Sequence, residues 1–176
     1  MNDSPAWLTD DEEHVWRRWL SLNATLPAAL HRALQAEAGL SLQDFEVLVR
    51  LTDTPDGRVR VSDLARDMLW ERSRLSHHVT RMEGRGMVVR EECPEDRRGV
   101  FVVLTERGRE AIERAAPGHV DAVRRMVFDG ISADDLAVFT RVVDAIAERV
   151  EAQGGEGQGG ETPSCPSMRG AAPATT

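Results

Sequence analysis

The segment from residue 62 to residue 104 constrains the fold most, because it contains two short helical patterns followed directly by two β-branched runs. Ser62 is expected to cap a first helix of about seven residues with one apolar face, and a second helix is predicted from Ser73 to about Arg85. Residues 87–92 and 100–104 favour extended structure on either side of a charged, proline-containing tip. The segment therefore predicts two helices joined by a short turn and followed by a β-hairpin.

Helices are also predicted on both sides of this segment. Thr9 and Glu12 have the spacing of a capping box, and the helical pattern after them runs to about residue 38, before Gly39. Ser41 and Asp44 repeat that signature. The remaining expected elements are an edge strand at 58–61, a helix from Thr105 to about Asp129 interrupted at Pro117 and Gly118, and a last helix capped by Ser132 with Asp135.

The last predicted helix has an apolar seam like that of a coiled coil. Its apolar residues recur at steps of three and four, at Leu136, Phe139, Val143, Ile146 and Val150. Such a seam needs a partner to cover it. Residues 1–8 are expected to be flexible, and the composition of 152–176 is typical of a disordered tail.

Net charge alone opposes nucleic-acid binding, but its distribution favours it. The chain of 176 residues has a formal charge of −8. Residues 58–98 nevertheless contain ten arginines against eight acidic residues, so this segment is slightly basic within an acidic chain. A DNA-binding surface is therefore expected there.

Several classes of protein are excluded by their missing signatures. No apolar run reaches the length of a membrane span and no secretory signal is present, so we expect a cytoplasmic protein. Cys93 and Cys165 do not form a disulfide framework, and the five histidines lack the spacing of zinc ligands. No phosphate-binding glycine loop or nucleophile with a base partner is found. We expect no metal, no cofactor and no enzymatic activity.

The order of elements resembles the MarR family of bacterial regulators. The local match lies in residues 64–88, in the hairpin tip Pro94–Gly99 and in the Leu-Thr-x-x-Gly pattern of Leu104–Gly108. The resemblance implies a mostly α fold with a small β-hairpin (α+β), in which a winged helix-turn-helix (41–104) is flanked by dimerisation helices (9–38 and 105–151) within one domain, 9–151. It also implies a homodimer on a pseudo-palindromic operator. Such a regulator represses, or less often activates, nearby genes.

The second helix of the helix-turn-helix separates into an apolar and a polar face. Leu75, Val79 and Met82 cluster on one side, with His78 packed at its flank. The opposite side contains donors that can contact phosphates or base edges, with no acidic residue among them; these candidates are Ser73, Arg74, Ser76, His77, Thr80 and Arg81. The alternative is an ordinary solvated face.

At the hairpin tip, Arg97 and Arg98 are expected to enter a minor groove, and the resemblance implies that Asp96 orients them. The alternative is a surface salt bridge with Asp96 or Glu95. A winged helix that binds only proteins would instead require an apolar or acidic face on the second helix.

Two forms of regulation stay open. Many relatives bind a small anionic or aromatic effector, and the candidates to line such a cleft here are Trp16, Trp19, His31 and Trp70. Aromatic residues at helical spacing are, however, more often part of a core or a dimer interface. Cys93 suggests a thiol switch acting on the hairpin, against which stands the simpler interpretation of an unreactive cysteine.

Overall fold

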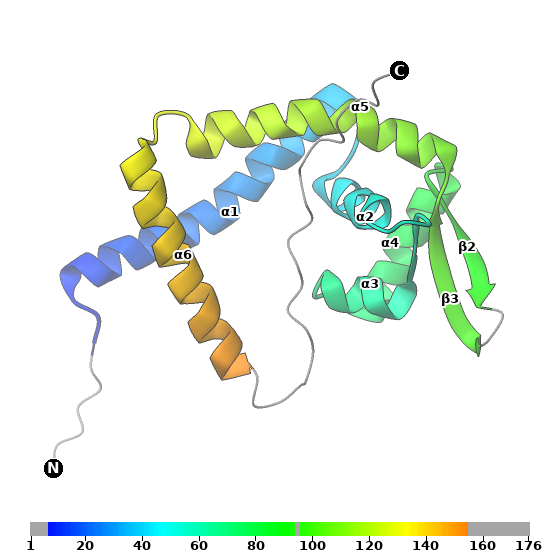
Figure 1. Ribbon diagram of the computed structural model, residues 1–176, viewed down its shortest axis with the longest axis horizontal. Coiled ribbons are helices and arrows are strands. Elements are labelled where there is room, and N and C mark those ends of the chain that lie inside the picture. Colours follow the sequence, from blue (N-terminus) through cyan, green and yellow to red (C-terminus); the bar gives the residue numbers. More distant parts are fainter. Residues whose placement is uncertain (1–6, 94–95, 155–176) are drawn as a thin grey trace, which may run out of the picture.

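A computed structural model describes residues 7–93 and 96–154, of which residues 96–98 are described by their backbone alone. The described part is mostly helical with one small antiparallel sheet, which confirms the expected fold class (Figure 1). Its elements are α1 (Asp10–Ala38), α2 (Leu42–Thr52), β1 (Arg58–Arg60), α3 (Val61–Asp67), α4 (Arg72–Gly84), β2 (Val88–Cys93), β3 (Asp96–Leu104), α5 (Glu106–Val123), the π-helical turn η1 (Arg124–Phe128) and α6 (Ala133–Gly154).

The capping residues predicted from the sequence begin and end their helices as expected. Thr9 and Ser41 each form a complete capping box with the acidic residue three positions later. Gly39 adopts the left-handed conformation (φ 66°) and ends α1. Thr105 caps α5, and the Ser132 hydroxyl accepts a hydrogen bond from the Asp135 amide at the start of α6.

Other predicted boundaries are wrong. Ser62 does not cap α3, because the helix begins at Val61 and Arg60 occupies the N-cap position without a side-chain bond. Helix α4 begins one residue before Ser73. Helix α5 continues through Pro117 and Gly118, where an interruption was expected. Helix α6 extends to Gly154, so its last turn lies in the predicted tail; residues 155–176 lie outside the described part.

The core lies where α2, α3 and α4 meet the sheet and α5. Its largest fully buried side chains come from all of these elements except α5, which contributes Ile112 at 5% exposure. They include Leu48 and Leu51 of α2, Leu64 of α3, Leu75, Val79 and Met82 of α4, and Val88 and Val102 of the sheet. Burial of this many apolar side chains fixes α4 against the rest of the domain.

The turn between α3 and α4 depends on an unusual backbone conformation. Leu69 is the one residue other than glycine with a positive φ (53°) in the described part, and its side chain is 82% exposed. The following amide, that of Trp70, donates to Ala65 O at 2.8 Å. A left-handed residue thus reverses the chain at this point and directs it into α4.

The sheet has the order β1-β3-β2, with both pairs antiparallel. Strands β2 and β3 form the predicted hairpin, which extends beyond the helices in Figure 1. Its base is fixed to α5: the Thr105 hydroxyl donates to Gly86 O at 2.7 Å, and a Cβ added to Gly108 would lie 2.1 Å from Met87 O. The Leu-Thr-x-x-Gly pattern therefore has a steric reason, since only glycine lets α5 approach the hairpin so closely.

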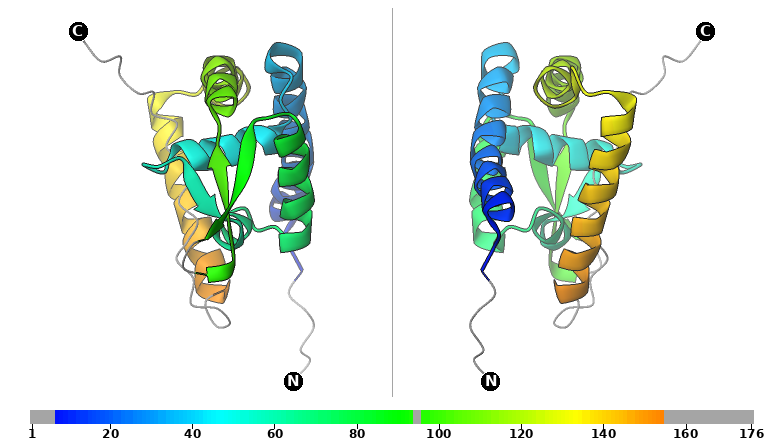
Figure 2. Two further views of the ribbon diagram at one scale, coloured as in Figure 1. Left: turned by 90° about the vertical axis from the view of Figure 1, so that its right-hand side faces the viewer. Right: turned by 90° about the vertical axis from the view of Figure 1, so that its left-hand side faces the viewer.

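Helices α1 and α6 leave large apolar surfaces uncovered. Figure 1 shows them crossing at one side of the molecule, whereas Figure 2 shows that they lie on opposite sides of it. Every residue of α6 with a described side chain is exposed except Ala145. The exposed large apolar side chains of the two helices are Val15, Trp16, Trp19, Leu20 and Leu22 in α1 and Leu136, Val138, Phe139, Val142, Val143, Ile146 and Val150 in α6. None of the described helices is long and apolar enough to cross a membrane.

Candidate nucleic-acid interface

Helix α4 separates into the two faces predicted from its periodicity. Leu75, Val79 and Met82 are fully buried, and His78 is 7% exposed. All six polar candidates on the other side are exposed: Ser73, Arg74, Ser76, His77, Thr80 and Arg81. With 100° between successive residues, Ser73, His77 and Thr80 lie at the centre of this face, and the remaining three lie on its two flanks. The flanks differ in what they contact.

On one flank, Arg90 of β2 connects the hairpin to α4. Its backbone amide and one guanidinium nitrogen donate to the Glu83 carboxylate, at 3.1 and 2.6 Å. Nη2 donates to Ser76 O at 2.8 Å and to Thr80 Oγ1 at 3.0 Å. The acidic residue on this flank is therefore paired, and the helix is held in a fixed orientation relative to the hairpin.

On the other flank, the buried carboxylate of Asp44 joins α2 to α4. It is 1% exposed and accepts from the Ser41 amide at 3.0 Å and from Arg85 Nη2 at 2.5 Å. His78 Nε2 lies 3.0 Å from Asp44 Oδ1, an ion-pair distance without the direction of a good hydrogen bond. Arg81 in turn contacts His78 Nδ1 at 3.0 Å. The side chains of α4 on this flank are thus fixed through one carboxylate.

Asp44 stays ionised in these surroundings. Burial by itself would raise its pKa, but the close contact with His78 and the hydrogen bonds from Arg85 and Ser41 outweigh this and hold the pKa well below its usual range. The charge of Asp44 is therefore matched by groups on α4 and at its C-cap.

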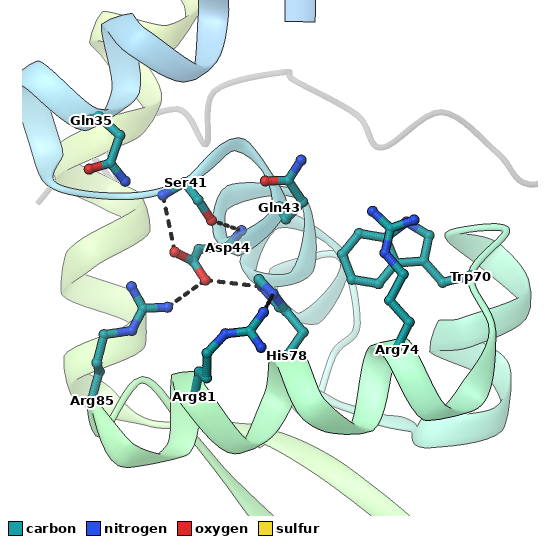
Figure 3. A pocket seen from close by; sticks show the side chains of 9 residues that line it. All are labelled: Gln35, Ser41, Gln43, Asp44, Trp70, Arg74, His78, Arg81 and Arg85. Atoms are coloured by element: carbon teal, nitrogen blue, oxygen red, sulfur yellow. Dashed lines mark hydrogen bonds and ion pairs between the residues drawn. The ribbon is translucent and has the colours of Figure 1, made fainter. Parts of the chain in front are cut away.

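An open pocket of about 790 Å³ lies beside this network, between α2 and α4 (Figure 3). Arg74 projects over the Trp70 ring, with its guanidinium carbon 4.3 Å from the ring centroid. Arg81 and Arg85 line the same pocket, together with the buried His78. The pocket thus combines an aromatic surface with several cationic groups around a single paired carboxylate.

The four predicted effector residues do not lie together. Trp70 lines the pocket, and the His31 ring accepts a hydrogen bond from the Leu42 amide at 3.3 Å. Trp16 and Trp19 are exposed on α1, in its uncovered apolar surface. The sequence analysis did not identify Arg85 and Asp44 as pocket residues. It predicted only that Asp44 takes part in a capping box, because that role depends on a residue three positions away.

The hairpin tip is described only in part. Asp96, Arg97 and Arg98 belong to β3 by their backbone, but their side chains lie outside the described residues, as does Glu95 entirely. At the end of β2, Cys93 is 5% exposed and Arg60 Nη2 donates to its sulfur at 3.3 Å. A thiol this deeply buried is poorly accessible to oxidants in this conformation.

Comparisons with known proteins identify the family. Residues 40–100 match the MarR family. The structure of Sco3205, a MarR family transcriptional regulator from Streptomyces coelicolor in complex with DNA, superimposes with a TM-score of 0.77 and 43% identity, over 84% of this chain and 92% of that one.

Two curated relatives from Bacillus subtilis also match. The transcriptional regulator YkoM is 28% identical over 56% of this chain and 62% of its own length, and the repressor YetL is 26% identical over 65% and 68%. The matched region thus spans less than two thirds of YkoM. Taken with the fold and with the extent of the match to Sco3205, these findings show that the chain belongs to the MarR family of transcriptional regulators.

Proposed function

We propose that this regulator is a homodimeric repressor that inserts α4 into the major groove of a pseudo-palindromic operator. The observation that carries the proposal is the exposed face of α4, which presents hydroxyl, imidazole and guanidinium groups and no unpaired acid. Ser73 and His77 lie at its centre, and their side chains form no hydrogen bond or ion pair within the described part of the chain. Such groups can donate to base edges and phosphates.

The hairpin supplies the second contact in this proposal. Arg97 and Arg98 at its tip would enter the neighbouring minor groove, with Asp96 orienting them. The bonds from Arg90 to Glu83, Ser76 and Thr80 support a joint action of hairpin and helix, because they hold the two in one arrangement.

Dimerisation would cover the apolar surfaces of α1 and α6. A monomer with Trp16, Phe139 and Ile146 each more than a third exposed would leave a large apolar area in contact with water. Two copies that interleave these helices would bury it and place two recognition helices about 34 Å apart, on successive turns of one face of DNA. The proposal that the protein represses transcription, rather than activating it, rests on the likeness to the repressor YetL. Such a protein would act in the cytoplasm, where its DNA lies.

The pocket between α2 and α4 supports a small planar anion as an effector. Trp70 offers an aromatic face, while Arg74 and Arg85 offer charge. A ligand there would compete with Asp44 for Arg85 and thereby change how α4 is held. Benzoate and benzamide test this site, since they share a shape and differ in charge. We expect benzoate alone to raise the melting temperature and to weaken DNA binding; equal effects of both compounds would refute an anion site.

The DNA-binding proposal is tested with the intergenic DNA upstream of the protein's own gene. We expect specific binding that resists unrelated competitor and weakens steeply as salt rises, because phosphate contacts release counterions. His77→Ala and Arg97→Ala should each weaken binding, whereas Arg114→Ala, an exposed control on α5, should not. Binding that shows no preference over competitor, or that survives both substitutions, would contradict the proposed interface.

Dimerisation is tested by light scattering coupled to size exclusion. Ile146→Glu places a charge in the α6 seam and should yield monomers. Arg141→Glu, on the opposite side of the same helix, is the matched control and should leave the dimer intact. A dimer that withstands Ile146→Glu would show that α6 does not form the interface.

A further inference from the structure

Thr80 lies at the centre of the exposed face of α4, yet its hydroxyl is already bonded within the protein. Its single hydrogen is donated to Ser76 O at 3.0 Å, one turn earlier in the helix. Its oxygen accepts from Arg90 Nη2, also at 3.0 Å. A hydroxyl has one donor and two acceptor positions, so this one has no hydrogen left to offer to DNA.

Arg90 makes this arrangement hard to change. The Nη2 group that bonds Thr80 also donates to Ser76 O, and Nη1 of the same guanidinium is paired with Glu83. Rotation of the Thr80 side chain would break both the bond to Ser76 and the bond from Arg90. Each loss would leave a polar group without the protein partner that it has in this arrangement.

The orientation of the hydroxyl fixes that of the methyl group. Oγ1 points toward Arg90 and the Ser76 carbonyl, so the methyl carbon occupies a different staggered position on Cβ, away from Arg90. Thr80 is exposed, and its neighbours on the central face, Ser73 and His77, are polar. The methyl of Thr80 is thus an apolar group at the centre of a polar reading surface.

We propose that Thr80 is a specificity-determining residue that reads the 5-methyl group of a thymine, with Arg90 as the positioning residue that turns its methyl toward the groove. This inference rests on the proposed insertion of α4 into the major groove. In that groove thymine alone displays a methyl group, and apolar contact with a threonine methyl is one way to recognise it. Thr80 cannot donate to the purine N7 or to guanine O6, which separates its role from that of Ser73 and His77.

The test compares thymine with uracil in DNA selected by the full-length protein from random duplexes. Uracil lacks only the 5-methyl group, so each thymine of the selected half-site is replaced in turn, symmetrically in both halves. At one thymine we expect the Kd to rise about fourfold per half-site, and about fifteenfold for the whole site, which corresponds to one buried methyl group in each half. Replacement of the other thymines by uracil should leave the Kd unchanged.

Two variants assign that effect to Thr80. Thr80→Ser keeps the hydroxyl and removes the methyl, so it should bind the thymine and uracil duplexes equally. Thr80→Val keeps a methyl at this position and should retain the preference for thymine. Circular dichroism and thermal unfolding of each variant confirm that the fold is kept.

Three outcomes overturn the inference. In the first, no replacement of thymine by uracil changes the Kd of the wild-type protein. In the second, the Kd of Thr80→Ser rises on this replacement as much as that of the wild type. In the third, Thr80→Val binds the ordinary duplex more weakly than the wild type does, but the two proteins bind equally once one purine is replaced by a 7-deazapurine, which lacks the N7 acceptor. The last result would show that the hydroxyl rotates to donate to a base. Failure of the selection to yield any specific duplex refutes the proposed function itself, and this inference with it.

Discussion

Replacement of Asp44 by asparagine should destabilise the protein more than any other single change from acid to amide. The carboxylate accepts from Ser41 through one oxygen and faces Arg85 and His78 with the other. An asparagine of the same size has one oxygen and one NH₂ group. One side of the network would therefore meet a donor where it needs an acceptor.

The magnitude follows from burial and from the partners left behind. Loss of one member of a buried ion pair costs about 3–5 kcal/mol, because a buried charge stays uncompensated. Asp44 meets that condition, but the Arg85 side chain is 39% exposed and can regain water. We therefore expect the Asp44→Asn protein to lose about 2–3 kcal/mol of unfolding free energy at pH 7.

The pH dependence gives the result a second signature. Because the pKa of Asp44 is lowered in the folded protein, its charge contributes stability above the pKa of the unfolded chain, about 3.9. That contribution is lost as the pH falls below this value. The difference between wild type and Asp44→Asn should thus be constant from pH 7 to pH 5 and shrink below about pH 3.9.

The assay is urea unfolding followed by tryptophan fluorescence, at one protein concentration because the stability of the proposed dimer would depend on it. Asp56→Asn is the control: Asp56 forms an exposed pair with Arg58 at 2.7 Å and should change stability by less than about 0.5 kcal/mol. Equal stability of Asp44→Asn and wild type at pH 7 would refute the argument that this carboxylate fixes α4.

Four further substitutions test the packing, the backbone and one buried histidine by urea or thermal unfolding. Gly108→Ala should cost about 1–3 kcal/mol through its clash with Met87 O, whereas Gly84→Ala, with no atom near the added methyl, should stabilise by about 0.5–1 kcal/mol. Leu69→Gly should stabilise by up to about 1 kcal/mol, since it removes a side chain from a left-handed residue, and a loss would contradict the strain assigned there. Burial lowers the pKa of His119, so stability should fall as the pH drops below about 6.5, the value for an unperturbed histidine, and His119→Phe should reduce that slope; an unchanged slope would exclude His119 as its source.

The parts of the fold that follow from local chemistry were predictable from the sequence. Capping boxes at Thr9 and Ser41 need only residues three positions apart, and the apolar spacing of Leu75, Val79 and Met82 defines the buried face of α4 without knowledge of its partners. The exposed polar face of α4 followed from the same periodicity.

The network that orients α4 was not predictable, because its members are distant in sequence. Asp44 meets Arg85 across 41 positions, and Arg90 reaches Thr80 from a strand. Sequence periodicity placed Thr80 and Arg81 on one face but could not show that the hydroxyl of Thr80 and a nitrogen of Arg81 are already bonded within the protein. Which groups of an exposed side chain stay available to DNA is therefore a property of the tertiary structure.

The continuity of α5 shows how one residue pattern can have two physical meanings. Proline followed by glycine, as at Pro117 and Gly118, is a common signal for the end of a helix. Here the helix continues, and a Cβ on Gly118 would lie 2.2 Å from the Glu37 carboxylate of α1. That carboxylate is the far end of a flexible, exposed side chain that can move aside, so the available space does not demand glycine here. Packing between α1 and α5 offsets the low helix propensity of Gly118. Gly118→Ala should accordingly displace the Glu37 side chain at little cost and raise the unfolding free energy by up to about 1 kcal/mol, as at Gly84, whereas a lower melting temperature would show that Glu37 cannot move aside.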